Sequence, residues 1–108
     1  MDRDQRLATL VSELSEETRA IRIGLDRTAE REHSEPIFTT SSFVFPDAAT
    51  MADAFVNNSG LSVYARVDNP TVDGFCRRLA VLEGAESCEA AASGMGAILS
   101  TLMAHCQA

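Results

Sequence analysis

Two residues in the middle of this 108-residue chain have side chains that could hold an anion. Tyr64 and Arg66 are separated by one residue, so in an extended chain both side chains leave the same face. A phenol hydroxyl and a guanidinium on one face can grip a phosphate, the arginine through two parallel N–H bonds. An arbitrary Tyr-x-Arg is more often a half-buried tyrosine beside a solvated arginine. The pair alone leaves both interpretations open.

A second stretch with chemical potential is Ser93-Gly94-Met95-Gly96, which lies between a predicted strand and a predicted helix. The first amides of a helix have no partner inside it and carry the positive end of its dipole. A glycine there lets an anion approach the backbone, so this place suits a phosphate. A glycine between a strand and a helix is usually just a turn, and the stretch alone decides little.

The best-defined element is a helix predicted from Pro70 to about Glu83. Asn69 can accept a hydrogen bond from its first turn, and Gly84 suits the left-handed cap at its end. Asp73 and Arg77 are spaced for an ion pair between neighbouring turns. The residues expected on its apolar face are Val72, Phe75, Leu79 and Leu82.

The other predicted elements are short. Helices are expected at about 4–14, at about 16–23 before Gly24, and from the cap Asp47 through Phe55. Residues 25–42 lose the helical period and are predicted to be irregular. Residues 87–92 are predicted to form a brief buried strand before the final helix. The order helix, strand, glycine turn, helix is typical of the opening unit of an α/β fold.

Composition argues against several classes of protein. The net charge of −7 disfavours a nucleic-acid partner, because phosphate contacts need a basic surface. Cys76, Cys88 and Cys106 lack the spacing of a metal site and indicate reduced thiols. No segment approaches the roughly 18 apolar residues of a membrane span, and a cytoplasmic location is expected. The carboxylates predicted to be solvated are Glu30, Glu32 and Glu35.

Four segments in order resemble one enzyme family: 33–45, 64–71, 82–86 and 92–95. Tyr64-Ala65-Arg66-Val67-Asp68-Asn69-Pro70-Thr71, followed by Ser93-Gly94-Met95, resembles the pyridoxal-phosphate enzymes of Cys/Met metabolism, the transsulfuration family. The sequence of residues 33–45 is similar to that of the O-succinylhomoserine sulfhydrylase branch of the family. The resemblance extends roughly from Ala20 onward. Cystathionine γ-synthases and methionine γ-lyases, which use the same phosphate grip, remain alternatives.

The resemblance implies pyridoxal 5'-phosphate as cofactor and the aspartate-aminotransferase-like architecture known as fold type I. Gly94 and Met95 would bind the cofactor phosphate through their amides. Tyr64 and Arg66 would reach the phosphate held by a neighbouring subunit, and Tyr64 is also implied as a candidate catalytic residue. The implied reaction replaces the succinyl group of an O-acyl-homoserine with sulfide, giving homocysteine for methionine biosynthesis. A homo-oligomer, a tetramer in the whole enzyme, is implied as well.

The chain contains no lysine, since all nine of its basic residues are arginine. Enzymes of this family hold the cofactor through a lysine, so we expect an N-terminal fragment that is inactive by itself. Residues 1–62 would be an arm that packs on a neighbouring subunit, and residues 63–108 the incomplete start of the cofactor-binding domain. The alternative from another class is a noncatalytic helical interaction domain, indicated by the leucine stripe at 7–14 and the acidic charge.

Overall fold

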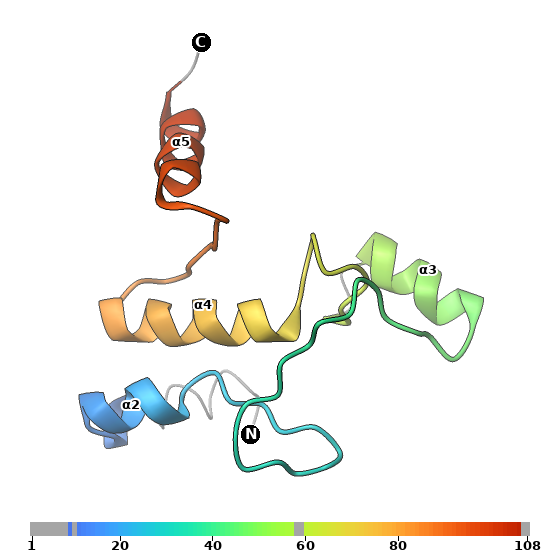
Figure 1. Ribbon diagram of the computed structural model, residues 1–108, viewed down its shortest axis with the longest axis horizontal. Coiled ribbons are helices and arrows are strands. Elements are labelled where there is room, and N and C mark those ends of the chain that lie inside the picture. Colours follow the sequence, from blue (N-terminus) through green and yellow to red (C-terminus); the bar gives the residue numbers. More distant parts are fainter. Residues whose placement is uncertain (1–8, 10, 58–59, 107–108) are drawn as a thin grey trace.

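The computed structural model describes residues 9, 11–57 and 60–106 of the chain. Its helices are α2 (Glu16–Arg22), α3 (Ala48–Asn57), α4 (Pro70–Glu83) and α5 (Gly94–His105). Figure 1 shows α2 lying along α4, whereas α3 and α5 stand away from that pair. In the described ranges, extended chain pairs at one isolated antiparallel bridge, between Ser42 and Tyr64. No helix in those ranges is long and apolar enough to cross a bilayer.

Helix α4 has the bounds that the sequence predicts, because both of its ends are fixed locally. The side chain of Asn69 accepts a hydrogen bond from the amide of Thr71 at 2.9 Å, and Pro70 takes the first helical position. At the other end Gly84 adopts φ +64°, and its amide returns to the last turn of the helix. The predicted ion pair between Asp73 and Arg77 is present at 3.0 Å.

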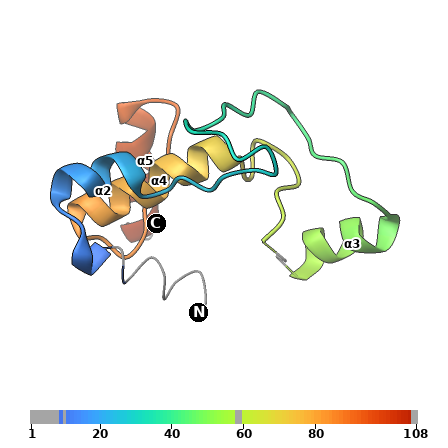
Figure 2. The ribbon, with the colours of Figure 1, turned by 90° about the horizontal axis from the view of Figure 1, so that it is seen from below.

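The face of α4 that is buried differs from the predicted one. Val72 and Phe75 are about half exposed, at 47% and 53%, whereas the buried residues of the helix are Gly74, Cys76 and Ala80. Figure 2 shows α2 and the chain after it lying against α4, and the two backbones approach closely at Gly24 and Gly74, where an added Cβ would collide. This approach accounts for the burial of Gly74. Cys76 lies on another side of the helix, beside Cys88 in the chain that follows α4.

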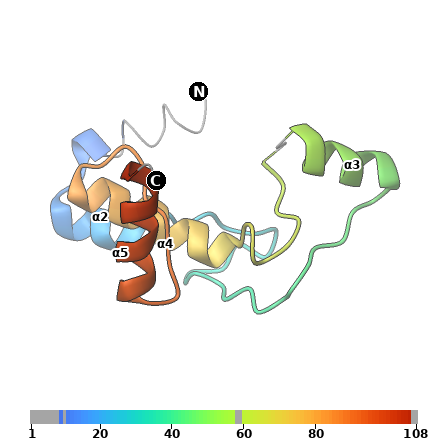
Figure 3. The same ribbon diagram turned by 90° about the horizontal axis from the view of Figure 1, so that it is seen from above.

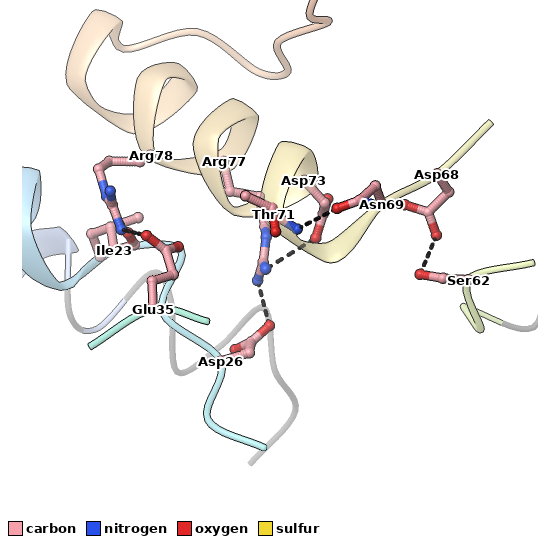
Figure 4. Close-up of polar contacts among 10 residues, drawn as sticks. All are labelled: Ile23, Asp26, Glu35, Ser62, Asp68, Asn69, Thr71, Asp73, Arg77 and Arg78. Carbon is pink, nitrogen blue, oxygen red and sulfur yellow. Dashed lines mark hydrogen bonds and ion pairs between the residues drawn. The ribbon is translucent and has the colours of Figure 1, made fainter. Parts of the chain in front are cut away.

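One apolar side chain and two ion pairs from the chain that follows α2 stabilise its packing on α4. Ile23, which follows α2, is 1% exposed and is the most deeply buried large side chain. Arg77 and Arg78 reach from α4 to Asp26 at 2.7 Å and to Glu35 at 2.9 Å (Figure 4). The prediction that Glu35 is solvated is therefore wrong, since its carboxylate is half-buried and paired.

The strand predicted at 87–92 does not form, and residues 85–93 run as irregular chain from α4 to α5. A strand needs a neighbouring strand to satisfy its amides and carbonyls, and no described segment pairs with this one. Helix α5 stands apart from the other helices in Figure 1, and in the view from above it lies in front of α4 (Figure 3). None of its described residues is buried, and Ile98, Leu99 and Leu102 are each more than half exposed. The prediction of a strand within this chain is wrong.

The remaining elements follow their local signals. Ser15 caps α2, which ends one residue earlier than predicted, and Asp47 caps α3 by accepting from the amide of Thr50 at 2.7 Å. That hydrogen bond, with a second one from the Thr50 hydroxyl, lowers the pKa of the Asp47 carboxyl. Residues 25–42 contain no helix, as predicted. Of the helix expected at 4–14, residues 9 and 11–13 are helical, and the other residues before 11 lie outside the described part.

The three free cysteines differ in exposure, which predicts an order of reactivity. Cys106 is exposed, Cys88 is intermediate and Cys76 is buried. Burial, aided by the neighbouring Cys88 thiol, raises the pKa of the Cys76 thiol, so less of it is thiolate at pH 8. We expect Cys106 to react first and Cys76 last with an aromatic disulfide reagent, followed by time-resolved absorbance and mass mapping. In denaturant the three rates should converge; equal rates in the folded chain would contradict the packing of α4.

Candidate functional site

The N-terminus of α5 presents two unsatisfied amides. Ser93 caps the helix, its hydroxyl oxygen accepting from the amide of Gly96 at 3.0 Å while its carbonyl accepts from Ala97. No acceptor in the described residues takes the amides of Gly94 and Met95. A Cβ built at Gly94 meets nothing within 4 Å, so an anion could approach these amides directly. The two N–H groups and the helix dipole together form a small anion-binding surface.

Tyr64 and Arg66 are brought together, but not as extended chain. The amides of Val67 and Asp68 both donate to the carbonyl of Tyr64, at 2.8 and 3.0 Å, so a turn begins at that residue. The guanidinium carbon of Arg66 lies 5.6 Å from the centre of the Tyr64 ring. The predicted extended geometry is wrong, yet the two side chains still share one side because the turn folds Arg66 back over the ring.

Arg66 differs from the arginines of α4 in having no carboxylate partner. Arg77 and Arg78 are tied to Asp26, Asp73 and Glu35 (Figure 4). The side chain of Arg66 is exposed, and no ion pair to it occurs in the part of the chain that the structure describes. The neighbouring carboxylate of Asp68 instead accepts from the hydroxyl of Ser62 at 2.8 Å. The guanidinium therefore keeps its donors available for an external anion.

The two candidate halves of the site are not brought together within one chain. Tyr64 and Arg66 precede the N-terminus of α4, whereas Gly94 follows its C-terminus, and this 14-residue helix is about 21 Å long. No hydrogen bond or ring contact joins Tyr64 or Arg66 to residues 93–96 in the described ranges. The described residues of one chain therefore do not form a single anion site from both halves.

From the sequence, Asn69 and Thr71 are expected only to form the start of α4. In the structure the Asn69 side-chain amide also donates to the carbonyl of Phe38 at 3.0 Å, and the hydroxyl of Thr71 accepts from the amide of Phe38 at 2.9 Å. The signal that could have revealed them is their place in the family-like string beginning at Tyr64. No group of three or more potential metal ligands occurs within the described residues.

Comparison with known proteins defines the class to which this arrangement belongs. Residues 17–108 match the model of the Cys/Met metabolism PLP-dependent enzymes, and the chain belongs to that family. The family uses pyridoxal phosphate and implies fold type I, of which the described residues contain helices but no strand.

Several individual enzymes of this family are similar in sequence to the chain. The chain is 51% identical over 90 residues to the O-succinylhomoserine sulfhydrylase of Pseudomonas aeruginosa, across 83% of this chain. It is 37% identical over 89 residues to the enzyme of the same name in Mycobacterium tuberculosis, across 82% of the chain. It is also 40% identical over 89 residues to the L-methionine gamma-lyase of Pseudomonas putida, across 79% of the chain. The chain spans 22% of the length of each of these relatives.

The observed residues fit the phosphate end of the cofactor. The open amides of Gly94 and Met95 and the unpaired guanidinium of Arg66 are donors of the kind that a phosphate requires. The aldehyde end needs a primary amine, and these 108 residues contain no lysine to supply one. The donors present therefore suit the phosphate of that cofactor and not its aldehyde.

Proposed function

We propose that this chain forms the phosphate-binding part of a pyridoxal-phosphate-dependent O-succinylhomoserine sulfhydrylase. That enzyme replaces the succinyl group of O-succinylhomoserine with sulfide, giving homocysteine and succinate. The similarity to two relatives of that name supports this assignment over the other members of the family. The observation that carries it is the exposed guanidinium of Arg66 beside Tyr64, which has no carboxylate partner in the described residues. This is so although the chain has 16 acidic and only 9 basic residues.

In the proposed enzyme each subunit contributes to two sites. The amides of Gly94 and Met95 hold the phosphate in their own subunit, and Tyr64 and Arg66 reach the phosphate held by the neighbour. The separation of the two motifs by the length of α4 supports this division. When bound, the cofactor withdraws electrons from the α-carbon of the substrate. The Tyr64 hydroxyl donates to the phosphate and, as a candidate catalytic group, moves a proton beside the substrate.

The finer architecture belongs to the same proposal. Residues 1–62 form an arm that packs on a neighbouring subunit, and residues 63–108 begin the cofactor-binding domain. The exposed apolar surface of α5 supports an environment in which other chain covers it. The whole enzyme is a homo-oligomer, a tetramer, and the free thiols support a cytoplasmic location.

A chimera tests the proposed function directly. Residues 17–108 of this chain replace the aligned segment of the Pseudomonas aeruginosa relative, whose remaining sequence completes the enzyme. At 51% identity we expect the chimera to bind pyridoxal phosphate and to form homocysteine from O-succinylhomoserine and sulfide within about tenfold of the parent rate. Product is measured by mass spectrometry, and the parent enzyme is the control. A chimera that folds but does not bind the cofactor contradicts the proposal.

The second candidate is a methionine γ-lyase, which the 40% identity to the Pseudomonas putida enzyme favours. The same chimera, assayed for thiol release from methionine, separates the two activities. A cystathionine γ-synthase would instead use cysteine in place of sulfide. The noncatalytic interaction domain loses support because the chain belongs to an enzyme family.

A further inference from the structure

The turn that carries Arg66 is tied at both ends to one stretch of chain, residues 36–43, which we call the strap. Before the turn, the amide of Ala65 donates to the carbonyl of Ser41 at 3.0 Å, and the amide of Phe43 donates to the carbonyl of Val63 at 3.3 Å. These bonds flank the bridge between Ser42 and Tyr64. The C-terminal part of the strap therefore fixes where Tyr64 leaves the backbone.

After the turn, two side chains at the start of α4 hold the other part of the strap. Asn69 is 7% exposed, and its side-chain amide donates to the carbonyl of Phe38. The hydroxyl of Thr71 accepts from the amide of Phe38 and lies 3.5 Å from the carbonyl oxygen of Pro36, to which it donates. Both backbone polar groups of Phe38 are thus bound by these two residues. Figure 4 shows Asn69 and Thr71 side by side at the beginning of α4.

The two sets of bonds close a ring around the turn. The ring runs from Tyr64 through the turn to Asn69 and Thr71, across to Phe38, along the strap to Ser41, and back to Ala65. Inside it, the carbonyl of Tyr64 accepts from two amides of the turn itself. The side chains of Tyr64 and Arg66 lie at the surface, and the stacking of the guanidinium on the ring is the one ring contact of the pair within the described residues. Their direction therefore depends on the backbone of the turn, which the ring of hydrogen bonds holds.

We propose that Asn69 and Thr71 are positioning residues, which aim Tyr64 and Arg66 at an external phosphate by fastening the strap. This rests on the proposed function, because it takes the phosphate of the cofactor as the target of that pair. Neither residue touches the anion. Both act through Phe38 and the strap, which explains why an Asn-Pro-Thr helix start follows the Tyr-x-Arg pair after two intervening residues.

Amide hydrogen exchange in the full 108-residue chain tests the ring without the cofactor. Thr71→Val keeps the shape of the side chain but removes the hydroxyl, so we expect exchange at Ala65 to become about fivefold faster. Thr71→Ser should restore the original rate. Thr50→Val removes a hydroxyl at the start of α3, where it bonds to Asp47, and should leave Ala65 unchanged. An unprotected Ala65 amide in the unsubstituted chain, or no change with Thr71→Val, overturns the proposal.

Cofactor binding in the chimera supplies a second readout, chosen to separate positioning from stability. Thr71→Val should weaken pyridoxal phosphate by about fivefold and leave pyridoxal, which lacks the phosphate, unchanged. Asn69→Asp keeps the cap on Thr71 but loses the donor to Phe38, and should behave in the same way. In a chimera that already carries both Tyr64→Phe and Arg66→Ala, neither change should weaken binding further. Equal losses for pyridoxal phosphate and pyridoxal overturn the proposal. A chimera that never binds the cofactor contradicts the proposed function instead, and the exchange experiment then tests the ring of hydrogen bonds independently.

Discussion

Replacing Arg66 with alanine in the chimera is expected to weaken the binding of pyridoxal phosphate by at least about 100-fold. Two charge-assisted hydrogen bonds to one phosphate are each worth about 1.5–3 kcal/mol, and every 1.4 kcal/mol is about tenfold in affinity. Because Arg66 has no carboxylate partner in the described residues, its loss leaves no buried charge behind and the folded chain should be unaffected. Titration followed by cofactor absorbance gives the dissociation constant.

Two controls separate this effect from a general change of charge. Arg31→Ala removes an exposed positive charge elsewhere in the chain and should leave the affinity within about twofold. Pyridoxal, which has no phosphate, should bind both variants and the unsubstituted chimera alike. If Arg66→Ala and Arg31→Ala weaken the cofactor equally, or if pyridoxal is affected as strongly, Arg66 does not bind the phosphate.

Replacing Gly24 with alanine is expected to lower the free energy of unfolding by about 3 kcal/mol or more. A Cβ at this position would collide with the carbonyl oxygen of Gly74, which belongs to the backbone of α4 and cannot rotate away. Gly24 also has φ +84°, a region that residues with side chains rarely adopt. Relief of the collision requires α2 and α4 to separate, which exposes Ile23. Urea unfolding of the full chain, followed by circular dichroism, measures the loss.

Gly84 offers a matched control for the cost of the backbone conformation alone. Its φ is +64°, and a Cβ built there meets nothing within 4 Å. Gly84→Ala should therefore cost about 1 kcal/mol, the usual penalty for a left-handed alanine at the end of a helix. The difference between the two variants isolates the contact with Gly74. Equal losses would mean that α2 and α4 are not packed as described.

Elements that are fixed by their own ends could be predicted from the sequence. The bounds of α4 follow from Asn69, Pro70 and Gly84, all of which act within one turn. The strand at 87–92 was predicted wrongly because pairing depends on distant chain, not on local composition. The buried face of α4 was also missed, because the pattern of large apolar residues does not reveal a close approach at Gly24. The sequence therefore predicts structure that depends on neighbouring residues, but not structure that depends on contacts between distant segments.

The candidate site shows the same division. Gly94 was placed at a helix start by its neighbours, and the structure confirms that location. Tyr64 and Arg66 were expected to share a face and do so, although through a turn. The pairing of Glu35 with Arg78 joins residues 43 positions apart, and no spacing rule predicts it. The binding roles of Tyr64 and Arg66 stay predictions that the substitutions above decide.

The contact between α2 and α4 also has a consequence for the speed of folding. It joins residues 51 positions apart at Asp26 and Arg77, and 55 apart at Ile23 and Arg78, so docking must close a large loop. A helix the length of α4 can form in about a microsecond, long before that loop closes. In a stopped-flow experiment helical circular dichroism should therefore appear first, and the long-range contacts of Ile23 and Asp26 should form only in a later phase.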